Sequence, residues 1–322
     1  MISRLRNLLP APAQPRLGNP LLQYELSKAQ GRAAGRNFAL QLTALMLLLA
    51  IAAALYAGAF GLDDAGNLSG RLWGSLYFPA LALQTITWSL ALALGAASVR
   101  AERSRKTWDK LRATAAGAGL ALRARWLGIL YRLRAPIAAI LLLRLLLALG
   151  ALLDVTAFGG HYVKMLSAAA APPLVDWRVG LLLIALSAAL SLAQPLVMIG
   201  SAAALGLFLS VTVAERFYGA LLQVALVALT VVFVVLASAG VNDILGGRLI
   251  ISDAAQFVLI LAYSSYGDWG LLLAHLGSLG AVWRVAPAGA YVCVGMAALL
   301  LLQALFADGL MSLAEQTSER RG

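Results

Sequence analysis

Residues 38–60, FALQLTALMLLLAIAAALYAGAF, decide the fold class of this chain, because they carry no charged side chain along their whole length. A helix needs about 20 mostly apolar residues to cross the hydrocarbon layer of a bilayer, which is about 30 Å thick. This stretch is long enough and apolar enough for that purpose. It therefore predicts a helix that spans a membrane.

Five more stretches are long and mostly apolar: residues 77–99, 129–153, 179–213, 217–239 and 285–307. Residues 179–213 are too many for one straight crossing, and Pro195 lies within them. Proline removes a hydrogen bond from a helix and bends it, so we expect a single kinked helix with an overhanging outer end.

The composition supports a membrane protein over a water-soluble one. Of the 322 residues, 61% are hydrophobic and 12% are charged, whereas soluble domains carry about 25% charged residues. A soluble fold of this length could not bury so much apolar surface. We therefore expect an all-α integral membrane protein with a six-helix transmembrane domain over residues 37–307.

Residues 257–278 are apolar only in part, because SSYGDWG at positions 264–270 interrupts them. A helix exposed to lipid could not leave the polar groups of such a stretch unsatisfied. We favour two re-entrant half-helices in the outer leaflet, packed on protein, over a seventh crossing, which stays open as the alternative.

Lysines and arginines are distributed unequally about the six predicted crossings. Nineteen of the 25 fall on the side that holds both termini, with Arg132 and Arg134 at the start of the third crossing counted on that side. Five fall on the other side, and Arg144 lies deeper within the third crossing. Cytoplasmic segments carry the excess of these residues. The pattern predicts cytoplasmic termini, and it explains the net charge of +11 without a nucleic-acid partner. We expect the protein in the inner membrane of a bacterial-type cell.

The chain before the first crossing divides into two predicted parts. Residues 1–18 are expected to form a flexible cytoplasmic tail. Residues 19–36 are expected to form an amphipathic helix in the inner interface, because Asn19 can cap a helix and Pro20 is tolerated in its first turn. Glu25 supplies charge and Leu26 supplies apolar area in this helix. A plain juxtamembrane anchor is the simpler alternative. Residues 308–322 are expected to form a cytoplasmic tail.

The cytoplasmic segment 100–128, between the second and third crossings, is strongly basic. A charge run is usually a solvated loop that only sets topology. Here Trp108 and Leu111 stand among the charges, and oppositely charged residues at helical spacing can support a helix. A helix that docks on a partner protein is therefore an equal alternative to the solvated loop.

Three motifs resemble those of one family. They are N-P-x-x-x-x-E-L (Asn19, Pro20, Glu25, Leu26), E-R-x-x-x-T-W-D-x-L-x-x-T (Glu102, Arg103, Thr107, Trp108, Asp109, Leu111, Thr114) and G-L-x-x-S-x-x-x-x-x-R (Gly206, Leu207, Ser210, Arg216). Together they look like the membrane subunit (permease) of ATP-binding-cassette (ABC) transporters of the second exporter class. The resemblance implies six helices per subunit, outer re-entrant half-helices, and a coupling helix in segment 100–128 that sits in a cleft of an ATPase.

The same resemblance implies a transporter built from two such subunits, as a homodimer or a heterodimer, with ATP and Mg²⁺ held by separate ATPase subunits. This chain contains no G-x-x-x-x-G-K-[ST] phosphate loop and no H-E-x-x-H motif, so we expect it not to be an enzyme. A structural subunit of a membrane complex that keeps the permease fold is the alternative.

Polar residues within the crossings are the remaining candidates. Arg144 stands among leucines, and a charge at membrane depth is costly enough to be a functional candidate. We favour a structural role for it, paired with Asp154 or with a neighbouring helix. For Gln84, Gln194, Gln223 and Gln303 we expect interhelical hydrogen bonds in preference to a substrate path.

Overall fold

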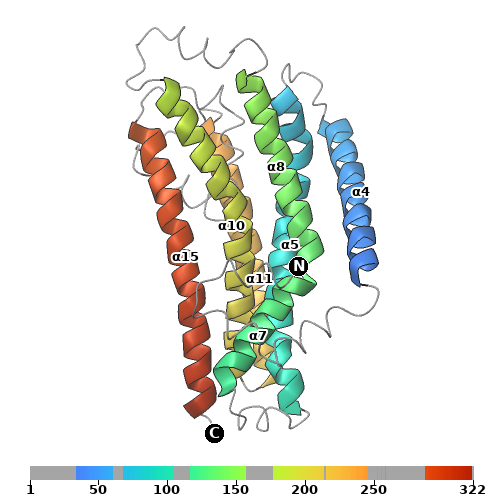
Figure 1. The fold of residues 1–322 in the computed structure, drawn as a ribbon, viewed down its shortest axis with the longest axis vertical. Coiled ribbons are helices and arrows are strands. Elements are labelled where there is room, and N and C mark those ends of the chain that lie inside the picture. Colours follow the sequence, from blue (N-terminus) through green and yellow to red (C-terminus); the bar gives the residue numbers. More distant parts are fainter. Residues whose placement is uncertain are drawn as a thin grey trace.

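The computed structural model describes residues 34–60, 68–104, 117–156, 177–213, 215–245 and 287–320, together with four single positions between 248 and 258. Within these ranges the chain is all-helical and contains no strand. The helices are α4 (Ala34–Phe60), α5 (Leu68–Ser104), α7 (Gly117–Arg132), α8 (Arg134–Thr156), α10 (Trp177–Thr212), α11 (Arg216–Leu245) and α15 (Pro287–Arg320) (Figure 1). The predicted all-α fold class is confirmed.

Five of these helices contain segments long and apolar enough to cross a membrane: Phe38–Tyr56, Ser75–Val99, Ala188–Thr212, Phe217–Ala237 and Cys293–Glu319. α7 and α8 meet the same requirement only when taken together, as a pair bent by 58°. The described part of the chain therefore holds five candidate spans, or six if the bent pair is one span. The protein is a multi-pass helical membrane protein.

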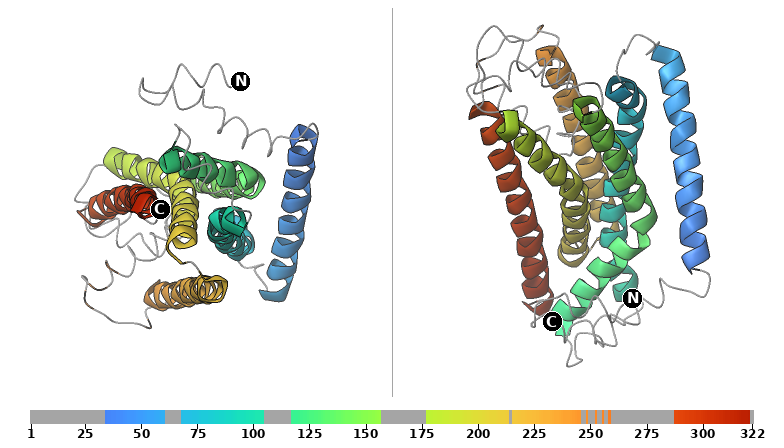
Figure 2. Two further views of the ribbon diagram at one scale, coloured as in Figure 1. Left: turned by 90° about the horizontal axis from the view of Figure 1, so that it is seen from below. Right: turned by 45° about the horizontal axis from the view of Figure 1, so that its top comes forward.

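The helices form an elongated bundle in which successive long elements run in opposite directions (Figure 1). α10 lies at the centre and packs most extensively against α5 and α15. α4 and α11 stand at the margins, as the view along the bundle shows (Figure 2, left). The start of α4 and the end of α15 lie at the same end of the bundle, which we call the α7 end because α7 also lies there.

The two marginal helices show why a membrane is needed. In α4 and α11, large apolar side chains are exposed over half or more of their surface: Leu40, Leu47, Leu55, Phe217, Val224, Leu229 and Leu236. Water would leave this apolar area unburied, whereas lipid tails solvate it.

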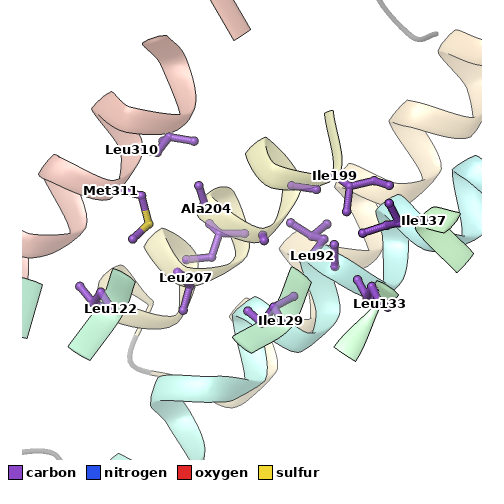
Figure 3. Close-up of a cluster of buried hydrophobic side chains, with 14 of the residues drawn as sticks. Leu92, Leu122, Ile129, Leu133, Ile137, Ile199, Ala204, Leu207, Leu310 and Met311 are labelled. Carbon is purple, nitrogen blue, oxygen red and sulfur yellow. The ribbon is translucent and has the colours of Figure 1, made fainter. Parts of the chain in front are cut away.

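The core lies where α5 crosses α10. Leu92 on α5 and Ile199 and Leu207 on α10 are fully buried there (Figure 3). A Cβ atom added to Gly206 would stand 2.4 Å from the Leu92 carbonyl oxygen, and one added to Gly95 would stand 2.7 Å from the Ala203 carbonyl oxygen. Small residues allow such close approach of helix backbones in membranes. The glycines of this crossing therefore bring α5 and α10 into contact.

The predicted third crossing, 129–153, is longer and more complex than expected. Helical structure begins at Gly117, and the bend falls between α7 and α8 at Leu133. Hydrogen bonds from Leu133 N to Ile129 O (3.1 Å) and from Ile137 N to Leu133 O (3.0 Å) continue across the bend. Pro136 has no N–H to give to the carbonyl four residues before it, which explains a bend at this point.

Other boundaries also differ from those predicted. α5 extends well beyond 77–99 at both ends, α11 continues past 239, and α15 continues past 307 to Arg320. Residues 308–320, predicted as a cytoplasmic tail, thus continue the helix α15. They pack on the bundle, because Leu310, Met311 and Ala314 are buried in the core. α10 is one unbroken helix through Pro195, and its upper part in Figure 1 is inclined to its lower part, in agreement with the single kinked helix predicted for 179–213. Residues 1–33 and the predicted re-entrant segment 257–278 lie outside the described residues, apart from position 258.

Candidate functional site

Arg144, the charged residue within the third crossing, lies on α8 with 7% of its surface exposed. Its Nη2 donates a hydrogen bond to Oε1 of Gln84 on α5 at 2.6 Å. Its Nη1 donates to the main-chain carbonyl of Ser191 on α10. Arg144 thus contacts two neighbouring helices; the side chain of Asp154 lies outside the described residues. We call Gln84, Arg144 and Ser191 the arginine junction.

The energetics of the arginine junction favour a structural role. An arginine at the centre of a membrane helix costs about 2.5–3.5 kcal/mol on insertion scales. A hydrogen bond to a charged group contributes about 1.5–3 kcal/mol, so two such bonds are large enough to offset that cost. The guanidinium can therefore stay charged and buried while it holds α5, α8 and α10 together.

Two further polar contacts join α10 to its neighbours, one of them from the arginine junction itself. Nε2 of Gln84 lies 3.3 Å from Sδ of Met198 on α10. Nε2 of Gln194, also on α10, donates to Oε1 of Gln303 on α15 at 3.1 Å. Three of the four glutamines thus form the predicted interhelical hydrogen bonds, and Gln223 is half-buried on α11. Polar side chains consequently attach α10 to α5, α8 and α15.

α7 is attached to α10 and α15 near the α7 end. Nε1 of Trp126 donates to the carbonyl of Gly200 on α10 at 2.8 Å. Nε of Arg123 lies 2.9 Å from Oε1 of Glu315 on α15. Leu122, beside Arg123, is fully buried. α7 therefore packs on both α10 and α15.

Sequence reasoning missed this packing and treated residues 117–128 as part of a cytoplasmic segment. The signal was present: Ala121, Leu122, Arg125 and Ile129 repeat at spacings of three and four, and all four are buried. The charges of Arg123 and Arg125 obscured it. Such a repeat marks one face of a helix.

Arg134, at the start of α8, connects the bend to α4. Its guanidinium carbon lies 4.9 Å from the ring centre of Phe38 on α4 and 4.3 Å from that of Tyr131 on α7. It also donates a hydrogen bond to the Tyr131 hydroxyl. A guanidinium over an aromatic face is attracted by the ring, so Arg134 fixes the base of α4 beside the bend.

The residues predicted to dock on an ATPase divide between described and undescribed parts. Glu102 and Arg103 belong to the last turn of α5. The other five, Thr107, Trp108, Asp109, Leu111 and Thr114, lie outside the described residues, as do Asn19, Pro20, Glu25 and Leu26. α5 ends at Ser104 and α7 begins at Gly117, and both of these helix ends lie at the α7 end (Figure 2, right).

The third motif of the family resemblance has a visible structural use. Gly206 and Leu207 lie in the contact of α10 with α5, and the buried Ser210 hydroxyl donates to the Leu207 carbonyl at 2.7 Å. Arg216 begins α11. This motif therefore packs the last turns of α10 against α5 and leads into α11.

Among the residues that the structure describes, no three His, Cys, Asp or Glu side chains are grouped closely enough to hold a metal ion. The two sites that remain are the arginine junction and the chain between α5 and α7. Comparison with known proteins adds nothing to them, since no family model, curated protein or solved structure matches this chain.

Proposed function

We propose that this chain is the permease subunit of an ATP-driven ABC transporter, of the exporter class. The observation that carries the proposal is the sequence E-R-x-x-x-T-W-D-x-L-x-x-T, which begins in the last turn of α5 and ends shortly before α7. An apolar pair, Trp108 and Leu111, within a basic cytoplasmic segment fits a docking surface for a separate ATPase, which would hold ATP and Mg²⁺.

The proposed topology has six crossings, with α7 and α8 as one bent span. The alternating directions of the helices (Figure 1) and the excess of lysine and arginine at the α7 end support it. Both termini are then cytoplasmic, in an inner membrane. In this topology, residues 257–278 are assigned to the outer re-entrant half-helices expected before α15.

The packing of α7 supports a route by which an ATPase could act on the membrane domain. α7 follows the docking segment directly, and it binds α10 through Trp126 and α15 through Arg123. A displacement of the docking segment would pull on α7. Because α7 is attached to both α10 and α15, the displacement would reach the centre of the bundle.

The proposed assembly contains two permease subunits, identical or related, with a transport path where they meet. Lipid surrounds the assembly, and nucleic acid has no part in it. The substrate class stays open.

Co-purification tests the proposal. The tagged wild-type chain, expressed from its native locus and solubilised in a mild detergent, is expected to bring down a cytoplasmic ATPase. The double variant Trp108→Ala with Leu111→Arg is expected to lose that ATPase, because it removes the apolar contact and adds a charge. ATPase recovered per membrane subunit is the measured quantity.

The control is Leu313→Arg, which places a charge on an exposed position of α15 (Leu313 is 50% exposed) outside the docking segment. It is expected to keep the ATPase bound. Recovery of no ATPase with the wild type would contradict the proposal, as would an unchanged amount with the double variant. An ATPase that binds but whose ATP hydrolysis is independent of the membrane subunit would favour the structural-subunit alternative.

A further inference from the structure

Pro195 leaves one main-chain carbonyl of α10 without its usual partner. In an α-helix the N–H of each residue donates to the carbonyl four residues before it, and proline has no N–H. The carbonyl affected is that of Ser191. Ser191 is 4% exposed and lies within the candidate span Ala188–Thr212. Membrane helices tolerate proline when a neighbouring helix supplies the missing donor.

The missing donor is Arg144. Its Nη1 donates to the Ser191 carbonyl from α8. The Ser191 hydroxyl is not involved, because it donates to the Ala188 carbonyl at 2.8 Å. The guanidinium therefore binds the main chain of α10 at the very carbonyl that the proline has freed.

The arginine junction also holds α10 on the other side of the proline. Gln84, which accepts from Arg144, is 1% exposed and contacts Sδ of Met198 through its Nε2. Ser191 precedes Pro195 in the chain and Met198 follows it. Both halves of α10 are thus connected, across the proline, to the same glutamine–arginine pair.

We propose that Arg144 and Pro195 are one conformational device, in which the guanidinium replaces the helical hydrogen bond that the proline removes and so fixes the bend of α10 against α5 and α8. Arg144 is a positioning residue in this proposal and does not bind substrate. The proposal is independent of the transport function, because it rests on contacts within this chain.

A double-mutant cycle tests the proposal. In Pro195→Ala, the alanine N–H can donate to the Ser191 carbonyl, so the carbonyl no longer depends on Arg144. The loss of the Arg144–Gln84 bond, by contrast, is the same in both backgrounds. Arg144→Gln is therefore expected to lower the midpoint of thermal unfolding of the purified full-length protein much more in the wild-type background than in Pro195→Ala. Residues that share a hydrogen-bonding partner, as Arg144 and position 195 share the Ser191 carbonyl, show such non-additive effects.

Two controls keep the comparison specific. Ser191→Ala retains the main-chain acceptor, so Arg144→Gln is expected to cost as much in that background as in the wild type. Pro79→Ala removes a proline from α5, a different helix from the one that carries the Ser191 carbonyl. The cost of Arg144→Gln is therefore also expected to be unchanged in that background.

An Arg144→Gln shift of equal size in the wild-type and Pro195→Ala backgrounds would overturn the proposal. If Arg144→Gln yields folded protein only together with Pro195→Ala, that rescue supports the proposal directly. If Arg144→Gln yields no folded protein in either background, Arg144→Lys takes its place in the same cycle. The lysine ammonium keeps the charge but lacks the fork of donors that reaches two helices. Equal shifts with lysine would then count against the proposal.

Discussion

At the residue scale, two glycines determine how closely the central helices approach. Gly95 and Gly206 face one another across the contact of α5 with α10, and a Cβ atom on either would meet main-chain atoms of the other helix. Main-chain atoms cannot move aside as a flexible side chain can. The sequence shows many glycines in apolar stretches, but it does not show which of them lie at a crossing.

Gly206→Ala is expected to destabilise the protein, because the added methyl group would lie within van der Waals distance of the Leu92 carbonyl and separate the helices. Overpacking of this kind costs about 1–3 kcal/mol. The measurement is the midpoint of thermal unfolding in detergent. Unfolding is monitored by the fluorescence of a thiol-reactive dye that reacts with Cys293, which is buried in the folded protein.

Gly309→Ala is the matched control, since it makes the same change within a helix where no atom lies within 4 Å of the added Cβ. Alanine is the better helix former by about 1 kcal/mol, so this variant is expected to be neutral or slightly more stable. Equal destabilisation by the two variants would show that the α5–α10 contact is not as close as described.

At the element scale, α7 is the helix that the sequence placed least well. Its charges are typical of a cytoplasmic loop, and the sequence places residues 117–128 in the predicted cytoplasmic segment 100–128. The structure instead packs it on α10 and α15, with Leu122 fully buried and Leu127 39% exposed. An element connected in this way contributes to the stability of the whole bundle.

Leu122→Ala is expected to lower the free energy of unfolding by about 2–5 kcal/mol, the range for removing a buried leucine side chain. Leu127→Ala makes the same change on the exposed side of α7 and is expected to cost less than about 1 kcal/mol. Both are measured by thermal unfolding of the purified protein. If α7 were a solvated helix, the two variants would be indistinguishable.

At the scale of the whole molecule, orientation follows from the alternation of the helices together with the charge asymmetry. The α7 end gathers the start of α4, the connection from α5 to α7 and the end of α15. These parts of the chain belong to the side of the six proposed crossings that carries nineteen of the 25 lysines and arginines. In the proposed topology, the positive-inside rule places this end in the cytoplasm.

Single-cysteine labelling tests the orientation. Cys293 is the one natural cysteine, and Cys293→Ala removes it. Glu215→Cys and Glu319→Cys, at exposed positions of the α7 end, are expected to react with a membrane-impermeant maleimide in inside-out vesicles only. Arg248→Cys, at a position with 67% side-chain exposure beyond the far end of α11, is expected to react from the opposite side. Labelling of Glu215→Cys and Arg248→Cys from the same side would exclude the topology.

The sequence by itself predicted the membrane environment, the all-helical fold class and the approximate position of each long apolar helix. These properties depend on local runs of apolar residues and on the distribution of charge, which a single chain displays directly. It also predicted interhelical contacts for Arg144 and four glutamines, because a polar group at membrane depth has to find a partner. The structure confirms this for Arg144 and for three of the four glutamines.

Only the tertiary structure decided which partners these residues have. The pairing of Arg144 with the Ser191 carbonyl joins positions 47 residues apart, and it depends on how α8 lies beside α10. The burial of α7 likewise depends on the length of α15, whose last turns continue where the sequence predicted a tail. Contacts of this kind arise from the packing of separate helices, and no local pattern in one helix records the surface of its neighbour.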